Sequence, residues 1–284
     1  MRQLPKPMAP FNVVCNACIS GISDLTLRRA FDAASDLMQR DAEQYDVYAS
    51  KGTLHSLQPM KIRNEDIALG NLTKQQLKDL YGTYMVKREA GRKYYDEILM
   101  LSDDGVCPLC SCGYVSTLDH YLPKGLFPSI SVLPTNLVPA CRDCNTSKLA
   151  GFGTELEMSI HPYFDDQRFF TDRWIFAKIR FEHCVRAEYF VSPPAHWDFV
   201  SKRRVKAHFK DLNLQKKYAV AAADELASTA DMLSTYLVTE EERVRYLNAR
   251  ATSFRINNVN AWQAALLSAL ASDKWYVTEG FRYK

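Results

Sequence analysis

Four cysteines in the middle of this 284-residue chain have the spacing of a metal site. The first pair lies in CPLC at 107–110 and the second in CRDC at 141–144, with 30 residues between the pairs. Thiolates spaced in this way can converge tetrahedrally on one Zn²⁺, which stabilises a segment too small to fold alone. We therefore predict a structural zinc site whose ligands are Cys107, Cys110, Cys141 and Cys144.

The other cysteines give weaker signals. Cys112 could replace Cys110 as a ligand, although we expect it to be a spare thiol. Cys15 and Cys18 form a third Cys-x-x-Cys pair with no partner pair left for it, and we expect them to be buried small side chains. The start of the chain lacks the apolar core of a secretory signal, so the cysteines favour reduced metal ligands in a cytoplasmic protein over disulfides.

Polar residues that could activate water lie between the two cysteine pairs and directly after them. Asp119 and His120 occur in LDHYLPK at 118–124, and Asn136 and Asn145 in TNLVPACRDCN at 135–145. A purely structural zinc finger would need apolar residues at these places. Carboxylate and amide oxygens can hold a second metal ion, and a histidine can take a proton from water. The pattern indicates a hydrolytic site on a zinc-bound scaffold.

The local sequence predicts two strands and a helix around these residues. We expect one strand over 117–121, a second around 130–133, and a short helix that begins at the second cysteine pair and runs through Lys148. Asp119 and His120 would lie on the first strand and Asn145 on the facing helix. The zinc ion would fix that helix to the first cysteine pair.

This order of residues resembles the HNH endonucleases, the ββα-metal nucleases. The 16-residue step from His120 to Asn136 and the 9-residue step from Asn136 to Asn145 are both typical of that motif. More loosely, GRKYYDE at 91–97, LDHYLPK and HPYFD at 161–165 are similar to HNH proteins of bacterial anti-phage loci, such as the Septu-type nuclease subunit. The resemblance is specific over about 45 residues.

The resemblance implies a role for each polar residue. His120 would be the general base, and an ordinary histidine pKa of ~6.5 leaves much of the ring neutral at working pH. Asp119 and Asn145 would be oxygen ligands of a catalytic Mg²⁺ or Mn²⁺. Asn136 would hold the loop and orient His120, and Lys148 would face the phosphate. The expected function is cleavage of DNA, with an ATPase partner or a second copy of the chain completing double-strand cleavage.

His161, in HPYFD, could be a further ligand or phosphate contact. We expect it instead to pack where the chain leaves the module.

Basic residues indicate where a polyanion could bind. The module itself has three basic residues against six acidic ones between 101 and 160, so neighbouring regions must help to hold DNA. Within the module these are Lys124, Arg142 and Lys148. A second set falls within about 100° of arc on one helix and could lie along a phosphate backbone: Lys202, Arg203, Lys206 and Lys210. A solvated helix face without ligand is the alternative, and the same alternatives apply to a cluster at 87–93.

Composition and patterning predict an α+β protein. Hydrophobic residues make up 47% and charged residues 24% of the chain, the net charge is only +3, and no apolar run is long enough for a membrane span. We expect a helical region over 1–102, a zinc-stapled ββα-metal (HNH) module over 103–160, and a β-hairpin with helices over 161–284.

Individual elements follow from periodicity and from capping signals. Residues 1–20 contain several prolines and are expected to be extended, and Thr73 with Gln76 predicts a capped helix start. Strands are expected over 174–181 and 185–191. Apolar residues at helical spacing predict helices over 24–49, 92–101, 195–212, 214–237, 239–251 and 259–272.

Two other functions remain compatible with the sequence. The first is a zinc module without nuclease activity that binds nucleic acid or a protein partner. The second is a nuclease directed at RNA, for example at tRNA, whose A-form grooves demand different contacts.

Overall fold

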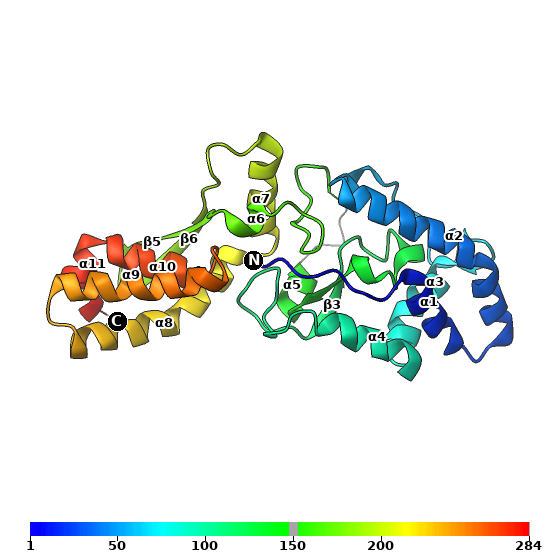
Figure 1. The fold of residues 1–284 in the computed structure, drawn as a ribbon, viewed down its shortest axis with the longest axis horizontal. Coiled ribbons are helices and arrows are strands. Elements are labelled where there is room, and N and C mark those ends of the chain that lie inside the picture. Colours follow the sequence, from blue (N-terminus) through cyan, green and yellow to red (C-terminus); the bar gives the residue numbers. More distant parts are fainter. Residues whose placement is uncertain (148–152, 284) are drawn as a thin grey trace. The chain divides into compact units, whose positions relative to one another are not determined.

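The computed structural model describes residues 1–147 and 153–283 (Figure 1). The chain divides into two compact units. The amino-terminal unit contains Gln3–Pro108 and Gly113–Asp165. The carboxy-terminal unit contains Asp166–Lys284 together with Met1–Arg2 and the short segment Leu109–Cys112.

Helices and very short strands make up the amino-terminal unit. Its α-helices are α1 (Phe11–Ser20), α2 (Leu25–Ser50), α3 (Lys74–Asp79), α4 (Glu89–Leu99) and α5 (Arg142–Ser147). Its strands are β1 (Ile67–Leu69), β2 (Leu72–Thr73), β3 (Thr117–His120) and β4 (Leu137–Ala140). Single helical turns complete it: η1 (Leu54–Ser56), the π-helix η2 (Leu80–Met85), η3 (Pro128–Ile130) and η4 (Pro134–Asn136).

The long helix α2 has the start and the buried face that the sequence predicts. The carboxylate of Asp24 caps it by accepting from the backbone N–H groups of Thr26 and Leu27 at 2.8 and 3.1 Å. Phe31 and Met38, at helical spacing, have no exposed surface. Helix α3 has the predicted capping box between Thr73 and Gln76. Both predictions are confirmed.

The first twenty residues are not all extended, and this prediction is wrong over Phe11–Ser20. The prolines end at Pro10, whose extended backbone precedes α1. From there, Val14, Cys15 and Cys18 recur at helical spacing and are buried. The two cysteines are therefore small core side chains, as expected, but they lie on a helix.

Helix α4 passes very close to the preceding π-helix, η2. A Cβ atom on Gly91 would lie 2.3 Å from the carbonyl oxygen of Tyr84 and 2.7 Å from the Cα of Met85. Only glycine allows this approach. The contact holds α4 against η2. The hydroxyl of Tyr81, in η2, donates to the carbonyl oxygen of Leu118 in β3.

The carboxy-terminal unit combines a β-hairpin with helices. Its elements are α6 (Arg168–Thr171), β5 (Ile175–Phe181), β6 (Val185–Val191), α7 (Phe199–Asp211), α8 (Leu214–Tyr236), α9 (Glu240–Asn257), α10 (Trp262–Ser272), α11 (Lys274–Thr278) and η5 (Gly280–Arg282). Strands β5 and β6 are antiparallel, with Ala177 opposite Tyr189. The hairpin and the four long helices of this half are confirmed, and the largest difference is at the end of α9, which continues to Asn257 instead of ending at 251.

One face of the hairpin packs against α8 and α10. Tyr189 is buried on that face, and its ring lies edge-on to Tyr218 of α8 at 5.3 Å between centroids. Its hydroxyl donates to the carbonyl oxygen of Trp262 in α10 at 3.3 Å. The buried amide oxygen of Asn260 accepts from the backbone N–H of Trp174 at 2.8 Å and so fixes the start of the hairpin.

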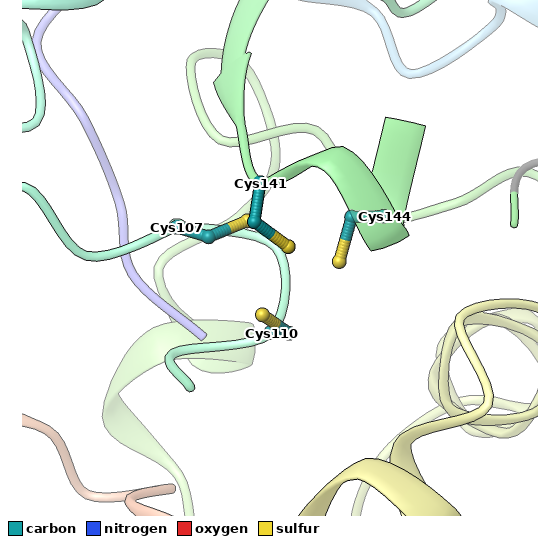
Figure 2. A group of neighbouring side chains, drawn as sticks. All are labelled: Cys107, Cys110, Cys141 and Cys144. Atoms are coloured by element: carbon teal, nitrogen blue, oxygen red, sulfur yellow. The ribbon is translucent and has the colours of Figure 1, made fainter. Parts of the chain in front are cut away.

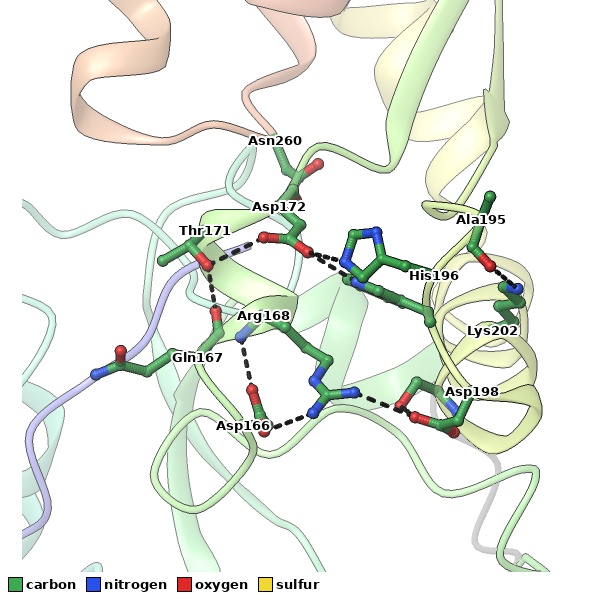
Figure 3. A network of polar contacts seen from close by, with 12 residues as sticks. Asp166, Gln167, Arg168, Thr171, Asp172, Ala195, His196, Asp198, Lys202 and Asn260 are labelled. Atoms are coloured by element: carbon green, nitrogen blue, oxygen red, sulfur yellow. Dashed lines mark hydrogen bonds and ion pairs between the residues drawn. The ribbon is translucent and has the colours of Figure 1, made fainter.

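A polar network ties α6 to the segment before α7 (Figure 3). The guanidinium of Arg168 lies 3.1 Å from a carboxylate oxygen of Asp166 and 3.2 Å from one of Asp198. Asp198 also caps α7 by accepting from Ser201 N–H at 2.8 Å. The cap and the ion pairs therefore position the start of α7.

The molecule is a mixture of helix and small sheets, and most of its regular structure is helical. This confirms the coarser part of the predicted fold class. Among the helices that the structure describes, none has both the length and the apolar composition required to cross a bilayer.

Candidate metal centre and hydrolytic site

The segment between the cysteine pairs forms a hairpin that is followed by a helix. Strands β3 and β4 are antiparallel, with Asp119 opposite Val138 and His120 opposite Leu137. Helix α5 follows β4 directly and packs against β3. The order strand, strand, helix agrees with the expectation, whereas its assignment to the HNH fold stays a prediction.

The second strand lies seven residues later than predicted. Residues 130–133 do not form a strand, because Ile130 ends the 3₁₀ turn η3, which begins at Pro128, and the next three residues connect it to η4, which begins at Pro134. Ser131, in the middle, is fully buried, and its hydroxyl donates to the carbonyl oxygen of Leu77 at 2.7 Å. The β-branched residues there are buried in a loop and not in a sheet.

The four cysteine sulfurs converge as predicted for a metal site (Figure 2). All four Sγ atoms lie within 4.8 Å of one another, and all four residues are buried. A tetrahedral Zn²⁺ with Zn–S bonds of about 2.3 Å places its sulfurs roughly 3.8 Å apart, so small shifts complete the geometry. A buried set of four thiols fits zinc. Cys112, the alternative ligand, is not part of this group.

Close backbone packing shapes the first cysteine pair. Cys107 N–H donates to the carbonyl oxygen of Gly113 at 2.8 Å, and Val115 N–H donates to that of Gly105 at 2.8 Å. A Cβ atom on Gly113 would lie 3.0 Å from the Sγ of Cys141, so a larger residue would press on a ligand.

Two buried side chains hold the segment Leu109–Cys112 in the carboxy-terminal unit. His208 of α7 donates from Nε2 to the carbonyl oxygen of Leu109 at 2.9 Å, and the Tyr218 hydroxyl donates to that of Cys110 at 2.8 Å. Burial lowers the pKa of His208 to about 3, so its ring is neutral. Sequence reasoning missed both residues, because their partners are distant backbone atoms.

His120 is buried in the amino-terminal unit. Its Nε2 lies 2.8 Å from the carbonyl oxygen of Ser131. A carbonyl oxygen only accepts, so Nε2 carries a proton, and Nδ1 is the nitrogen that could act as a base. The edge-on ring of Tyr81, 4.4 Å away between centroids, packs against it.

Asp119 is also buried, next to His120 in β3. Its charge acts on Tyr81, whose pKa is raised mainly by burial and further by Tyr95 and Asp119. The Tyr81 hydroxyl donates to the carbonyl oxygen of Leu118 at 3.1 Å. Tyr81 therefore contacts the strand that carries both Asp119 and His120.

Asn136 is fully buried and joins the two sides of the loop between β3 and β4. Its Oδ1 accepts from Leu122 N–H at 2.7 Å, and its Nδ2 donates to Leu122 O at 3.2 Å. These bonds suit the expected role in holding the loop. Asn145 is half-buried on α5, and its backbone N–H donates to Cys141 O at 3.1 Å.

Comparison with known proteins places the chain in a family. It is 31% identical over 247 residues to protein ea31 of Escherichia phage lambda, and the match covers 84% of this chain and 81% of the phage protein. The chain belongs to the ea31 family. No family model matches the chain, and no solved structure matches it.

In this member of the ea31 family, the basic residues of the module differ in how deeply they are buried. Lys124 is half-buried, with its Nζ 4.6 Å from the centroid of the Tyr81 ring. Burial and the nearby charge of Lys78 lower the pKa of Lys124. Arg142 is exposed on α5, and Lys148 lies outside the described residues.

The predicted basic face of α7 is exposed in part. Arg203, Lys206 and Lys210 point into solvent. Lys202 is half-buried, and its Nζ donates to the carbonyl oxygen of Ala195 at 2.7 Å (Figure 3). Three of the four residues are therefore exposed, and their contact with DNA stays a prediction.

His161 is a core residue of the amino-terminal unit. Its Nδ1 accepts from Tyr163 N–H at 3.2 Å, so Nε2 carries the proton and lies 3.0 Å from the Tyr45 hydroxyl. The ring of Tyr121 packs on it at 4.0 Å between centroids. This is the packing role that we expected.

Proposed function

We propose that this ea31-family protein is a metal-dependent endonuclease that hydrolyses DNA phosphodiester bonds. The observation that supports the proposal most strongly is the pairing of β3 with β4 and the packing of α5 on β3. This arrangement joins the strand of Asp119 and His120 to the helix of Asn145. Two of the four converging cysteines, Cys141 and Cys144, lie at the start of the same helix.

His120 is the general base in this proposal. Its Nε2–H is held by the Ser131 carbonyl, so the ring keeps one tautomer and one orientation. Nδ1 is then the nitrogen that takes a proton from the attacking water. A positioned base of this kind contributes about 10²- to 10⁴-fold to a rate.

Asp119 and Asn145 provide the oxygen atoms for a divalent cation. A Mg²⁺ or Mn²⁺ ion bound by one carboxylate and one amide, with water and substrate phosphate as its other ligands, fits the usual preference of Mg²⁺. The ion would supply stabilisation of the negative charge on the phosphate and the leaving oxygen. Among the described residues, the four cysteines form the one cluster of three or more His, Cys, Asp or Glu ligands, so the divalent-cation site stays a proposal.

Positive charge next to this site comes from few groups. Lys124 contacts the ring of Tyr81, which also packs on His120. Arg142 extends from the helix of Asn145. The exposed cations of α7 would hold the polyanion elsewhere.

We also propose that the protein acts in anti-phage defence with an ATPase partner. This part of the proposal rests on the HNH resemblance. A single module with one base cuts one strand per site. Double-strand cleavage then requires a second copy or a partner that brings two sites together.

The experiment is a cleavage assay with zinc-loaded protein on supercoiled plasmid, single-stranded DNA and tRNA. Each substrate is incubated with Mg²⁺, with Mn²⁺ or without added metal. We expect nicked plasmid only with added metal, and a reaction roughly 100-fold slower for Asp119→Ala, which removes a ligand of the ion that stabilises the developing charge. Asp143→Ala, which removes an exposed acid from α5, is the matched control and should be unchanged.

The rivals predict other products. A zinc module without activity would bind plasmid but leave it supercoiled under every condition. An RNA-directed enzyme would cut tRNA and spare DNA. Equal cleavage by Asp119→Ala and the unaltered protein would contradict the assignment of the metal ligand.

A further inference from the structure

The solvent side of the β5–β6 hairpin carries an unusual set of side chains. Alternation along the strands places one set of residues opposite to the face that packs on α8 and α10. We call this set the outer face: Phe176, Lys178, Arg180, Arg186, Glu188 and Phe190. In the register, Phe176 is opposite Phe190, Lys178 is opposite Glu188, and Arg180 is opposite Arg186.

Two aromatic rings form one end of the outer face. Phe176 and Phe190 are stacked, with their centroids 6.0 Å apart and an angle of 23° between the planes. Phe190 is 38% exposed. Rings on a solvated strand face offer apolar, planar surface that burial against the unit's helices does not use.

Cations surround these rings. The guanidinium carbon of Arg173 lies 4.2 Å from the centroid of Phe176, and Lys178 Nζ lies 5.8 Å from that of Phe190. Burial and the nearby charge of Arg255 both lower the pKa of Arg173. In the part of the chain that the structure describes, the guanidinium groups of Arg173 and Arg255 have no carboxylate oxygen within 4.0 Å.

Two further arginines stand directly opposite each other along the hairpin. Arg180 and Arg186 are 56% and 55% exposed, and like charges in this position destabilise a strand pair. Glu188 relieves part of the repulsion by pairing with Lys178 at 3.1 Å and with Arg180 at 2.9 Å. Arg186 pairs with Glu182 in the turn. Cations still outnumber acids on this face.

We propose that the outer face of the hairpin binds single-stranded nucleic acid. Its rings stack with unpaired bases, and its cations contact the phosphates on either side. Stacking requires bases that are free of a partner strand, so the surface discriminates single strands from duplex. An acidic peptide would satisfy the charges but would leave the stacked rings without planar partners.

This inference goes beyond the proposed nuclease. Binding by the hairpin does not require His120, so it can be measured whether or not the protein hydrolyses DNA. The two proposals can therefore fail separately.

The test is fluorescence anisotropy with a labelled 20-nucleotide dT strand and with the duplex of the same length. All proteins carry His120→Ala, and no Mg²⁺ is added, so that the probe stays intact. The test variant is Phe176→Leu with Phe190→Leu. The matched control is Phe181→Leu, whose ring is 46% exposed and packs on Trp275 and Tyr283 at 5.0 and 5.3 Å, away from the outer face.

We expect the double leucine variant to bind the single strand at least about tenfold more weakly, with duplex binding changed less. The Phe181→Leu control should stay within about twofold of the parent protein. Phe176→Tyr with Phe190→Tyr should keep the affinity, because it preserves the rings. Thermal melts followed by circular dichroism verify that each variant folds.

A second comparison tests the cations. Arg180→Gln with Arg186→Gln should weaken binding and reduce the slope of log Kd against log salt by roughly 1.4, about 0.7 for each lost phosphate contact on a single strand. Arg63→Gln, which removes an exposed ion-paired arginine from the amino-terminal unit, is the control.

Three results would overturn the proposal. The parent protein could fail to bind the single strand, the double leucine variant could bind it as tightly as the parent, or the loss could be equal for single strand and duplex. Displacement of the oligonucleotide by poly-glutamate of the same charge, with equal efficiency in parent and leucine variant, would also exclude stacking.

Discussion

The imidazole of His120 donates from Nε2 to the backbone carbonyl of Ser131 at 2.8 Å. The serine is itself fixed, because its hydroxyl donates to the carbonyl of Leu77 at 2.7 Å. The orientation of the proposed base therefore depends on a loop that a second hydrogen bond holds in place.

Ser131→Ala should reduce the cleavage rate without changing DNA binding. The substitution leaves the Leu77 carbonyl without its buried donor and costs about 1–3 kcal/mol of stability. The loop then relaxes, and the His120 ring loses its fixed acceptor. Single-turnover rates and urea unfolding measure both effects. Ser129→Ala, at another buried serine of the same loop, is the control and should change the cleavage rate and the stability only slightly. A larger loss of cleavage rate in Ser129→Ala than in Ser131→Ala would contradict the positioning role of Ser131.

Asn136→Ala should destabilise the amino-terminal unit by about 2–4 kcal/mol, because two hydrogen bonds to the Leu122 backbone are lost in a buried place. Asn136→Asp keeps the acceptor for Leu122 N–H but buries an acid beside the Leu122 carbonyl, so it should be less destabilised at low pH, where the protonated carboxyl can donate, than at pH 7. Urea unfolding at equal zinc content measures the difference. Equal stability of Asn136→Ala and the unaltered protein would show that the amide does not hold the loop.

The cysteine cluster should bind one zinc ion per chain. We expect Cys107→Ser with Cys110→Ser to give insoluble or unfolded protein, because the metal-binding free energy contributes to folding. Cys112→Ser should keep its zinc and its fold, since this thiol is not in the cluster. Elemental analysis and circular dichroism report the outcome. A soluble double variant with normal activity would remove the zinc site from the account.

The thiols of Cys15 and Cys18 should resist alkylation in the folded protein. Burial is the main cause that raises the pKa of each to about 12, and the nearby Asp32 adds to it for Cys15. A raised thiol pKa means that the folded state keeps the proton, so at pH 8 only roughly one thiolate in 10⁴ is present, against roughly one in four for an ordinary cysteine.

Reactivity of these two thiols should rise about tenfold per pH unit from pH 8 to pH 11. Peptide mass spectrometry after brief iodoacetamide treatment measures it, with Cys184, a partly exposed thiol, as the internal comparison. Alkylation of Cys15 and Cys18 at the rate of Cys184 at pH 8 would contradict their burial in α1.

The sequence predicted those elements whose signals are local. The capping box at Thr73, the buried stripe of α2 and the alternation of β5 and β6 depend on near neighbours in the chain. The cysteine cluster was also predictable, because its spacing specifies a ligand set before any fold is known.

Failures arose where tertiary contacts outweighed local propensity. Ile130 and Val132 favour a strand, yet prolines on either side and the buried hydroxyl of Ser131 place them in a loop. The proline-rich start hid the helical spacing of α1. His208 and Tyr218 contact carbonyl groups about a hundred residues away in the chain, which no periodicity can indicate.

The central claim is that His120 is the base of a nuclease, and one measurement tests it most directly. Plasmid nicking with Mg²⁺ is compared for the unaltered protein, His120→Ala and His183→Ala, an exposed histidine, at equal zinc content and equal plasmid affinity. The account predicts at least a 100-fold loss for His120→Ala alone. Equal nicking by all three proteins, or none by the unaltered protein, would contradict it.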